Sequence, residues 1–137
     1  MSEQNKEAAL TYLKALGRGD AVLMDSILTD DFDTLARGTA KICGRRTREE
    51  TVAFTGAVPS LFKDGIRFEF ESITAEADRV ACQLKGYSTL ADGRVYNNEY
   101  IYLFHVRDGK IYHMDEYIDT KYADETLLEM MDELQVK

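Results

Sequence analysis

The sequence lacks the features that mark several large classes of proteins. It contains only two cysteines, Cys43 and Cys82, and they do not form a C-x-x-C pair. Two isolated cysteines provide no disulfide framework and indicate a reducing compartment. The opening residues lack the apolar segment of a signal peptide, and no apolar run approaches the roughly 20 residues that cross a bilayer. We therefore expect a cytoplasmic protein that does not enter a membrane.

Basic residues and chain breakers are also scarce. The 17 Lys and Arg residues are outnumbered by 25 Asp and Glu residues, which gives a formal net charge of −8. Nucleic acids and anionic membranes both favour basic surfaces, so neither is expected as the main partner. The single proline, Pro59, and the absence of a Pro-rich or Ser/Gly-rich linker predict one domain over residues 1–137.

No signature of a cofactor or metal site is present. The chain has neither a glycine-rich phosphate loop nor a nucleophile elbow. Its only histidines, His105 and His113, fall on two different predicted strands and are expected on different faces. Without a His/Cys cluster at ligand spacing, we expect no metal and no organic cofactor.

Hydrophobic periodicity predicts three helices in the first half of the chain. Apolar residues recur at helical spacing over residues 2–16. Asp20 is suited to cap a short second helix, and residues 32–36 resemble a strand. Residues 47–50 (TREE) form a capping box, which predicts a third helix with a break or kink near Pro59.

The second half of the chain alternates with the period of β-strands. Residues 66–72 and 80–85 alternate between apolar and polar side chains. The ADGR and RDGK strings at 91–94 and 107–110 are hairpin signals, so residues 95–106 and 111–119 should pair antiparallel. A closing helix is expected to bury Leu127, Leu128, Met131 and Leu134.

This order of elements predicts an α+β fold. Helices should cover one face of a strongly curved, antiparallel (mixed) sheet that wraps around the three N-terminal helices. A bent sheet closed in this way leaves a cone-shaped pocket, which is a natural site for a small molecule. A C-terminal helix completes the domain.

Several strings resemble the SnoaL-like, ketosteroid isomerase-related proteins of the nuclear transport factor 2-like superfamily. Residues 12–20 (YLKALGRGD) look like the first helix and Gly-Asp turn of that superfamily, and residues 27–32 (ILTDDF) look like its second helix and first strand. YNNEY at 96–100, VRDGKI at 106–111 and EYIDT at 116–120 are similar to its later strands. The resemblance implies the fold and a homodimer. It does not select a reaction, because this scaffold carries isomerases, cyclases, dehydratases, epoxide hydrolases and non-catalytic binders.

The resemblance also implies roles for individual residues. Tyr12 matches a tyrosine that helps to bind the oxyanion in ketosteroid isomerase, whereas Ala36 stands where that enzyme has its general base. The second oxyanion donor of the isomerase falls near Ile101, on the same face as Glu99. Glu116 matches a water-activating aspartate of limonene epoxide hydrolase and could serve as the acid/base of a cyclase. The Arg/Asp partners of the hydrolase correspond to Gln83 and Lys85, which disfavours epoxide hydrolysis.

Strand alternation then gives a predicted site. Residues 97, 99, 101, 103 and 105 share one face, as do residues 114, 116 and 118 of the next strand. The resemblance implies that both faces line the pocket. A carboxylate among apolar side chains is costly unless it is paired or protonated, which raises its pKa and suits acid/base chemistry. The alternatives are that Glu99 pairs with Lys85 and that Tyr12 is a core residue. The predicted catalytic residues are Glu116, Glu99 and Tyr12, and the predicted ligand contacts are Asn97, Ile101, Leu103, Met114, Ile118 and His105.

These residues favour a cofactor-independent, isomerase- or cyclase-like enzyme that moves a proton on a small apolar, carbonyl-containing ligand. The rival hypothesis is a non-catalytic dimeric domain that binds a hydrophobic small molecule or a protein partner, and the missing base at Ala36 favours it. A third possibility, dehydration, depends on His105. A homodimer is expected because Tyr100, Tyr102 and Phe104 alternate away from the predicted pocket, and so large an aromatic stripe rarely faces water.

Overall fold

The computed structural model describes residues 2–136, with side chains described up to Leu134. It contains one six-stranded sheet together with N-terminal and C-terminal helices. The helices are α1 (Ser2–Arg18), α2 (Ala21–Ile27), α3 (Arg48–Leu61), α4 (Thr120–Ala123), the π-helical turn η1 (Asp124–Leu128) and α5 (Glu129–Val136); the strands are β1 (Leu28–Ala36), β2 (Gly44–Thr47), β3 (Phe62–Glu76), β4 (Arg79–Leu90), β5 (Asn98–Arg107) and β6 (Lys110–Ile118).

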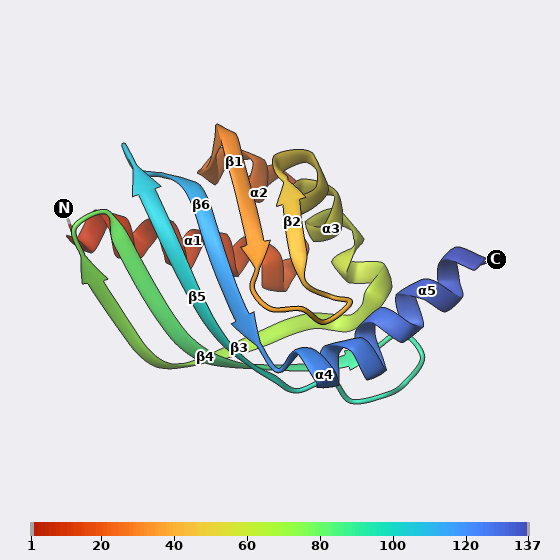
Figure 1. Cartoon of the computed structure of the whole chain (residues 1–137). Coiled ribbons are helices and arrows are strands. Elements are labelled where there is room, and N and C mark those ends of the chain that lie inside the picture. Colours follow the sequence, from red (N-terminus) through yellow and green to blue (C-terminus); the bar gives the residue numbers. More distant parts are fainter. Residues whose placement is uncertain (1, 137) are drawn as a thin grey trace.

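The strands lie in the order β2-β1-β6-β5-β4-β3. Neighbouring strands run antiparallel except β1 and β6, which are parallel. Figure 1 shows the curved sheet passing in front of α1, with α2 and α3 behind its right-hand side and α5 extending from the body. We call the face turned toward α1 the inner face and the opposite one the outer face. The predicted α+β class and curved mixed sheet are confirmed.

The helices begin where local signals in the sequence place them. The Asp20 carboxylate accepts a hydrogen bond of 3.0 Å from the backbone N–H of Leu23 and caps α2. At the start of α3, the Thr47 hydroxyl accepts from the Glu50 amide and the Glu50 carboxylate accepts from the Thr47 amide, which completes the predicted capping box. α3 continues through Pro59 and ends two residues later.

The hairpin that joins β5 and β6 contains an irregularity with large consequences. Asp108 and Gly109 form its turn with φ values of 51° and 77°, as a two-residue turn of type I′ requires. The register then shifts, so that His105 lies opposite His113. Tyr112 is therefore the extra residue of a β-bulge. Because side chains alternate along a strand, this single insertion reverses which face every later residue of β6 shares with β5.

The core lies between the inner face and the helices. Tyr100, Tyr102 and Phe104 of β5 are buried there, and the rings of Tyr12 and Phe104 meet edge to face with centroids 5.1 Å apart. Burial of each large side chain contributes about 1.5–3 kcal/mol. The prediction that this aromatic stripe faces outward is therefore wrong, because helix α1 covers it.

The C-terminal helix buries a face that differs in part from the predicted one. Leu127 is buried as predicted, but the next buried residue is Met130, whereas Met131 is half-buried and Leu134 is 51% exposed. Ala123, Leu127 and Met130 follow the i, i+4, i+7 spacing of an amphipathic helix. Beyond them α5 extends from the body of the protein (Figure 1).

The two cysteines are both free thiols. Cys82 lies in the core on β4, where burial raises its pKa to about 12, so it is poorly reactive. Cys43 donates to the carbonyl oxygen of Arg37 at 3.2 Å. Within residues 2–136, none of the helices has the length and apolar character to span a membrane.

Candidate functional site

Glu116 projects from the middle of β6 onto the inner face of the sheet. It lies opposite Tyr102 on β5 and opposite Ala36 on β1. Met114, the next residue along the same face, is buried. Glu116 itself is only half-buried, so the residue keeps some contact with solvent. The site thus contains a carboxylate in largely apolar surroundings, next to a tyrosine.

The environment of Glu116 favours its protonated form. Burial raises the pKa of the carboxyl group, while hydrogen bonding to Tyr102 and the positive charge of Arg46 lower it, and the net pKa is above its ordinary value. Desolvation therefore outweighs both partners. A carboxyl group with a raised pKa can both give and accept a proton closer to neutral pH, which general acid/base catalysis needs.

Two tyrosine hydroxyls accompany this carboxyl group. Tyr12 on α1 and Tyr102 on β5 are each 3% exposed. Burial raises the pKa of both hydroxyls, and the nearby negative charge of Glu116 raises it further. Both hydroxyls are therefore neutral over the physiological range and can donate hydrogen bonds to an oxygen that develops negative charge.

Arg46 is a site residue that the sequence did not reveal. On β2 it pairs with Thr34 of β1, a buried residue, whereas the preceding Arg45 forms an ion pair with Asp33, with Nε and Oδ2 2.6 Å apart. The Arg46 guanidinium donates to the carbonyl oxygen of Ile42 at 2.7 Å, and its charge acts on Glu116. β2 is only four residues long and was not predicted. The sequence therefore did not indicate that Arg45 and Arg46 lie on opposite faces of a strand.

Asn98 holds one edge of the site. It is 2% exposed, and its side-chain amide donates to the Tyr96 hydroxyl at 2.8 Å. Its carbonyl oxygen accepts from the backbone N–H groups of Glu99 at 2.7 Å and Asp119 at 3.3 Å. Burial, together with the charge of Glu116, raises the pKa of Tyr96 to about 12, although hydrogen bonding to Asn98 opposes the increase. Asn98 therefore fixes Tyr96 near Glu116 with its own polar atoms satisfied.

Comparison with known proteins identifies the family. A sequence model of the SnoaL-like domain matches residues 9–114. The chain belongs to the SnoaL-like family. No curated protein matches this SnoaL-like chain. The matched region ends two residues before Glu116, so the family match itself does not include the central carboxylate.

Solved structures share the fold of this SnoaL-like protein at low sequence identity. An LEH-like epoxide hydrolase from M. tuberculosis aligns with a TM-score of 0.76 and 20% identity, covering 98% of this chain and 97% of the hydrolase. The BvnE pinacolase from Penicillium brevicompactum gives 0.78 and 16%, covering 96% and 97%. PrhC from Penicillium brasilianum gives 0.81 and 14%, covering 98% and 91%. At these identities the likeness shows the fold, which is that of the nuclear transport factor 2-like superfamily.

The predicted site residues are divided between the two faces of the SnoaL-like sheet. Met114 and Ile118 share the inner face with Glu116, as the sequence predicted. The residues predicted on β5 do not, because the bulge at Tyr112 places Tyr102 opposite Glu116 where an unbulged hairpin would place Ile101. The residues that consequently lie on the outer face are Glu99, Ile101, Leu103 and His105.

The remaining predicted contact, Asn97, is not on the inner face either. Asn97 precedes β5, is exposed, and accepts a hydrogen bond of 3.3 Å from the backbone N–H of Ser88. The strand register places Lys85 opposite Glu99 and Gln83 opposite Ile101, all away from the inner face. Glu99 is therefore not a second carboxylate of the Glu116 site.

His105 cannot share an inner site with Tyr12, since it lies on the outer face of the sheet. Its cross-strand partner there is His113. The prediction that the two histidines lie on different faces is wrong, again because of the bulge. The dehydration hypothesis, which required a histidine and a tyrosine in one cavity, loses its support.

Two hollows in the described part of the molecule lie away from Glu116. A groove of about 710 Å³ runs between α1 and β3, where Lys14, Arg18 and Arg67 accompany apolar residues that include Leu13 and Phe68. A smaller hollow of about 230 Å³ is lined by residues that include Glu99, Ile101 and Tyr117. Glu116 lines neither of them.

Proposed function

We propose that this SnoaL-like protein is a cofactor-independent, isomerase- or cyclase-like enzyme that moves a proton on a small apolar, carbonyl-containing ligand. The observation that carries this proposal is the inner-face position of Glu116, half-buried, with a raised pKa and with two neutral tyrosine hydroxyls for neighbours. The names of two similar structures, an epoxide hydrolase and a pinacolase, support small-molecule chemistry on this scaffold.

Each residue of the site has a distinct role in the proposal. The ionised Glu116 carboxylate removes a proton from the carbon next to the ligand carbonyl and returns it to another position. The Tyr12 hydroxyl donates to the carbonyl oxygen as negative charge develops on it, while Tyr102 keeps its hydrogen bond to Glu116 and orients the carboxylate. Arg46 adds positive charge nearby, and the apolar neighbours limit access of water. Glu99, which was predicted as a second catalytic residue, has no part in this arrangement.

A proton-exchange assay tests the proposal. A thermal-shift screen of steroids, polyketides and terpenoids with carbonyl groups supplies candidate ligands, and mass spectrometry then follows deuterium uptake by each ligand in ²H₂O. We expect uptake with the wild-type protein and a loss of about 10²–10⁴-fold in Glu116→Gln. Glu99→Gln, which removes a carboxylate from the outer face, is the matched control and should retain the activity. Equal uptake with wild type and Glu116→Gln would reject Glu116 as the acid/base.

A second candidate function is a non-catalytic domain that binds a hydrophobic small molecule or a protein partner. Aromatic packing of the inner face favours it: the ring centroids of Tyr100 and Tyr102 are 5.2 Å apart, and those of Tyr102 and Phe104 are 6.0 Å apart. Neither of the two hollows described above is lined by Glu116, so a ligand bound in either of them would not reach the carboxyl group. Ligands that raise the melting temperature without any deuterium uptake would favour this candidate.

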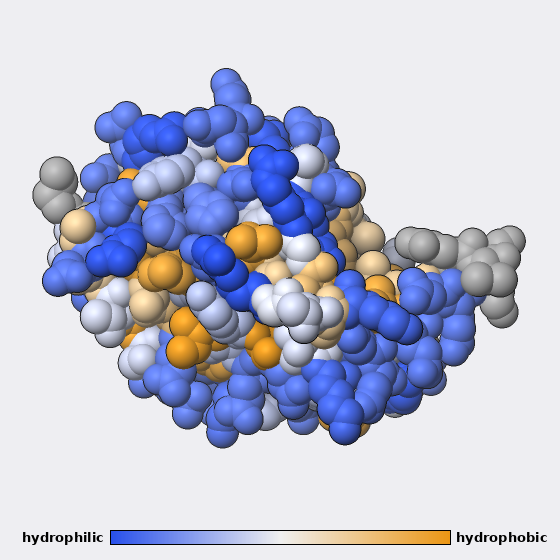
Figure 2. All heavy atoms as spheres, viewed as in Figure 1, coloured by the Kyte–Doolittle hydropathy of each residue, from blue (hydrophilic) through white to orange (hydrophobic). Residues whose placement is uncertain are grey.

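We also propose a homodimer, on residues that differ from those predicted. On the outer face, Ile101 and Tyr117 lie opposite each other and are 44% and 50% exposed. Figure 2 shows separate apolar patches on this side of an otherwise hydrophilic surface. A second copy could cover this pair. Light scattering at micromolar concentration should give the dimer mass for the wild type and a larger monomer fraction for Ile101→Lys, whereas a monomeric wild type would reject the proposal.

A further inference from the structure

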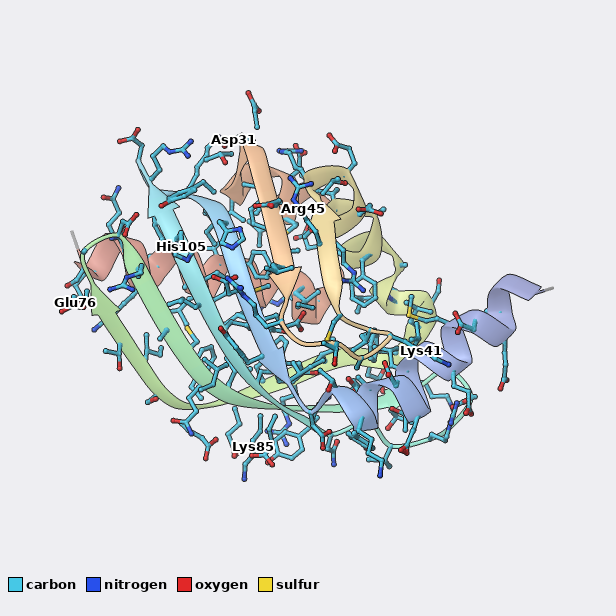
Figure 3. The ribbon with its side chains drawn as sticks, viewed as in Figure 1. Asp31, Lys41, Arg45, Glu76, Lys85 and His105 are labelled. Carbon is cyan, nitrogen blue, oxygen red and sulfur yellow. The ribbon has the colours of Figure 1, made fainter. Side chains whose placement is uncertain are left out.

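The only two histidines of the chain meet on the outer face of the sheet, on the side opposite Glu116. His105 and His113 are cross-strand partners with ring centroids 5.2 Å apart. Asp115 lies next along β6 on the same face, and its side chain is only 8% exposed. Figure 3 shows His105 toward the upper end of β5, with the Arg45 label on β2 to its right. We call His105, His113 and Asp115 the histidine cluster.

The spacing of the cluster is that of a metal site. One ligand atom from each of the three residues lies within 4.8 Å of the others. His105 Nε2 is 3.4 Å from Asp115 Oδ2, and His113 Nε2 is 3.0 Å from Asp115 Oδ1. Ligands bound to one ion at about 2.0–2.2 Å in tetrahedral geometry lie roughly 3.3–3.6 Å from each other. Small side-chain movements therefore suffice to place all three atoms around a single ion.

Neighbouring residues orient the cluster in the manner of an outer shell of ligands. His113 Nδ1 is 2.7 Å from Asp33 Oδ1, which directs Nε2 of the same ring toward Asp115. Arg37 Nε is 3.0 Å from Asp115 Oδ1, so Oδ2 remains on the side of His105. Hydrogen bonds of this kind fix ring orientation and increase the basicity of the ligands at metal sites.

We propose that His105, His113 and Asp115 bind one divalent transition-metal ion on the outer face, independently of the Glu116 site. Two imidazoles and one carboxylate suit Zn²⁺, Co²⁺ or Ni²⁺, whereas Mg²⁺ and Ca²⁺ prefer oxygen ligands alone. Three protein ligands leave a position for water. The charges of Arg37 and Arg45 already balance Asp115 and Asp33, so the affinity should be below that of a site with uncompensated carboxylates. The bound ion would tie β5 to β6 beside the bulge at Tyr112.

A zinc titration tests this site directly. Untagged protein is purified without a chelating resin, treated with EDTA and exchanged into metal-free buffer at pH 7.5. Calorimetry should show one Zn²⁺ per chain, and the melting temperature should rise with Zn²⁺ but not with Mg²⁺. In ¹H–¹⁵N spectra of the imidazole rings, the signals of both histidines should change together up to one equivalent. Binding well below one equivalent, or a change confined to one histidine, would overturn the proposal.

Variants show which residues hold the ion. His105→Ala should lower the Zn²⁺ affinity at least tenfold, and His105→Gln serves the same purpose if circular dichroism shows that the alanine variant is unfolded. Glu99→Gln is the matched control, since it changes a carboxylate on the same strand and the same face and should leave the affinity unchanged. Undiminished affinity in both His105 variants would assign the binding to other groups and reject the histidine cluster as the site.

Discussion

Tyr102 on β5 and Glu116 on β6 are cross-strand partners on the inner face of the sheet. Hydrogen bonding from the tyrosine lowers the pKa of the carboxyl group, and burial of the carboxyl group raises it by more. Burial and the charge of Glu116 both raise the pKa of the Tyr102 hydroxyl, which therefore stays neutral. The balance between burial and this partner determines how readily Glu116 exchanges a proton.

Removal of the Tyr102 hydroxyl should therefore raise the pKa of the Glu116 carboxyl group. We expect Tyr102→Phe to raise the pKa of Glu116 above its wild-type value and to cost about 1 kcal/mol of folding stability for the lost hydrogen bond. An NMR titration of the Glu116 carboxyl carbon measures the pKa. Tyr112→Phe, which removes a hydroxyl that donates to Asp78 on the exposed surface, should leave that titration unchanged. A lower pKa in Tyr102→Phe would contradict the proposed interaction.

Glu116 should also make folding stability depend on pH. The pKa of Glu116 is higher in the folded chain than in the unfolded chain. The contribution of this carboxyl group to folding stability is therefore fully present below the unfolded pKa of about 4.3, and it is lost as pH rises through the folded pKa. Glu116→Gln removes this loss. The variant should gain stability relative to wild type between pH 4 and pH 8, by about 1.4 kcal/mol for each pKa unit that separates the two states. Urea denaturation at several pH values gives the free energies of unfolding of the variant and the wild type. If the advantage of the variant became smaller or changed sign as pH rises, the raised pKa of Glu116 would be refuted.

The bulge at Tyr112 predicts that two single-residue deletions in β6 have different effects. Deletion of Tyr112 removes the extra residue and keeps Phe104 opposite Met114, so every later residue of β6 retains its face. We expect this variant to fold. Deletion of Asp115 keeps the bulge and would turn Glu116 to the outer face, which should cost more than about 4 kcal/mol of folding stability or prevent folding. Urea denaturation compares the two variants, and equal losses of stability would contradict the register.

The capping box at α3 offers an independent test of the local structure beside Arg46. Thr47→Ala should remove the hydrogen bond to the Glu50 amide and destabilise the protein by about 0.5–2 kcal/mol. Glu49→Ala changes an exposed carboxylate in the same turn and should cost less than Thr47→Ala. Thermal denaturation of the two variants distinguishes the cap from the general effect of charge at the helix start. Equal costs would show that the cap contributes no specific stability.

Local signals in the sequence were sufficient to predict most of the fold. Asp20, Thr47 and Glu50 specify helix starts through hydrogen bonds to nearby amides, and Asp108-Gly109 specifies a turn through positive φ values. Each of these signals involves residues at most three apart. Interactions of such short range depend little on the rest of the chain, and they appear in the structure where they were expected.

The site was harder to predict because it depends on register. Glu116 could be placed on the pocket side of the sheet and Tyr12 on the buried side of α1, but a one-residue bulge decided whether Glu116 would face Ile101 or Tyr102. No short pattern marks Tyr112 as the extra residue, since the bulge is determined by burial of the aromatic stripe against α1. Arg46 was missed for a similar reason, as β2 is too short for alternation to be recognised.

The most direct test of the account is the pKa of Glu116 in the free protein. Selective ¹³C labelling of glutamate carboxyl groups, with Glu116→Gln to assign the signal, follows its ionisation by NMR. The structure predicts a titration midpoint above the roughly 4.3 of an unperturbed glutamate, because burial outweighs Tyr102 and Arg46. A midpoint at or below that value would show that Glu116 is held as a paired carboxylate, and it would contradict its assignment as the acid/base of this site.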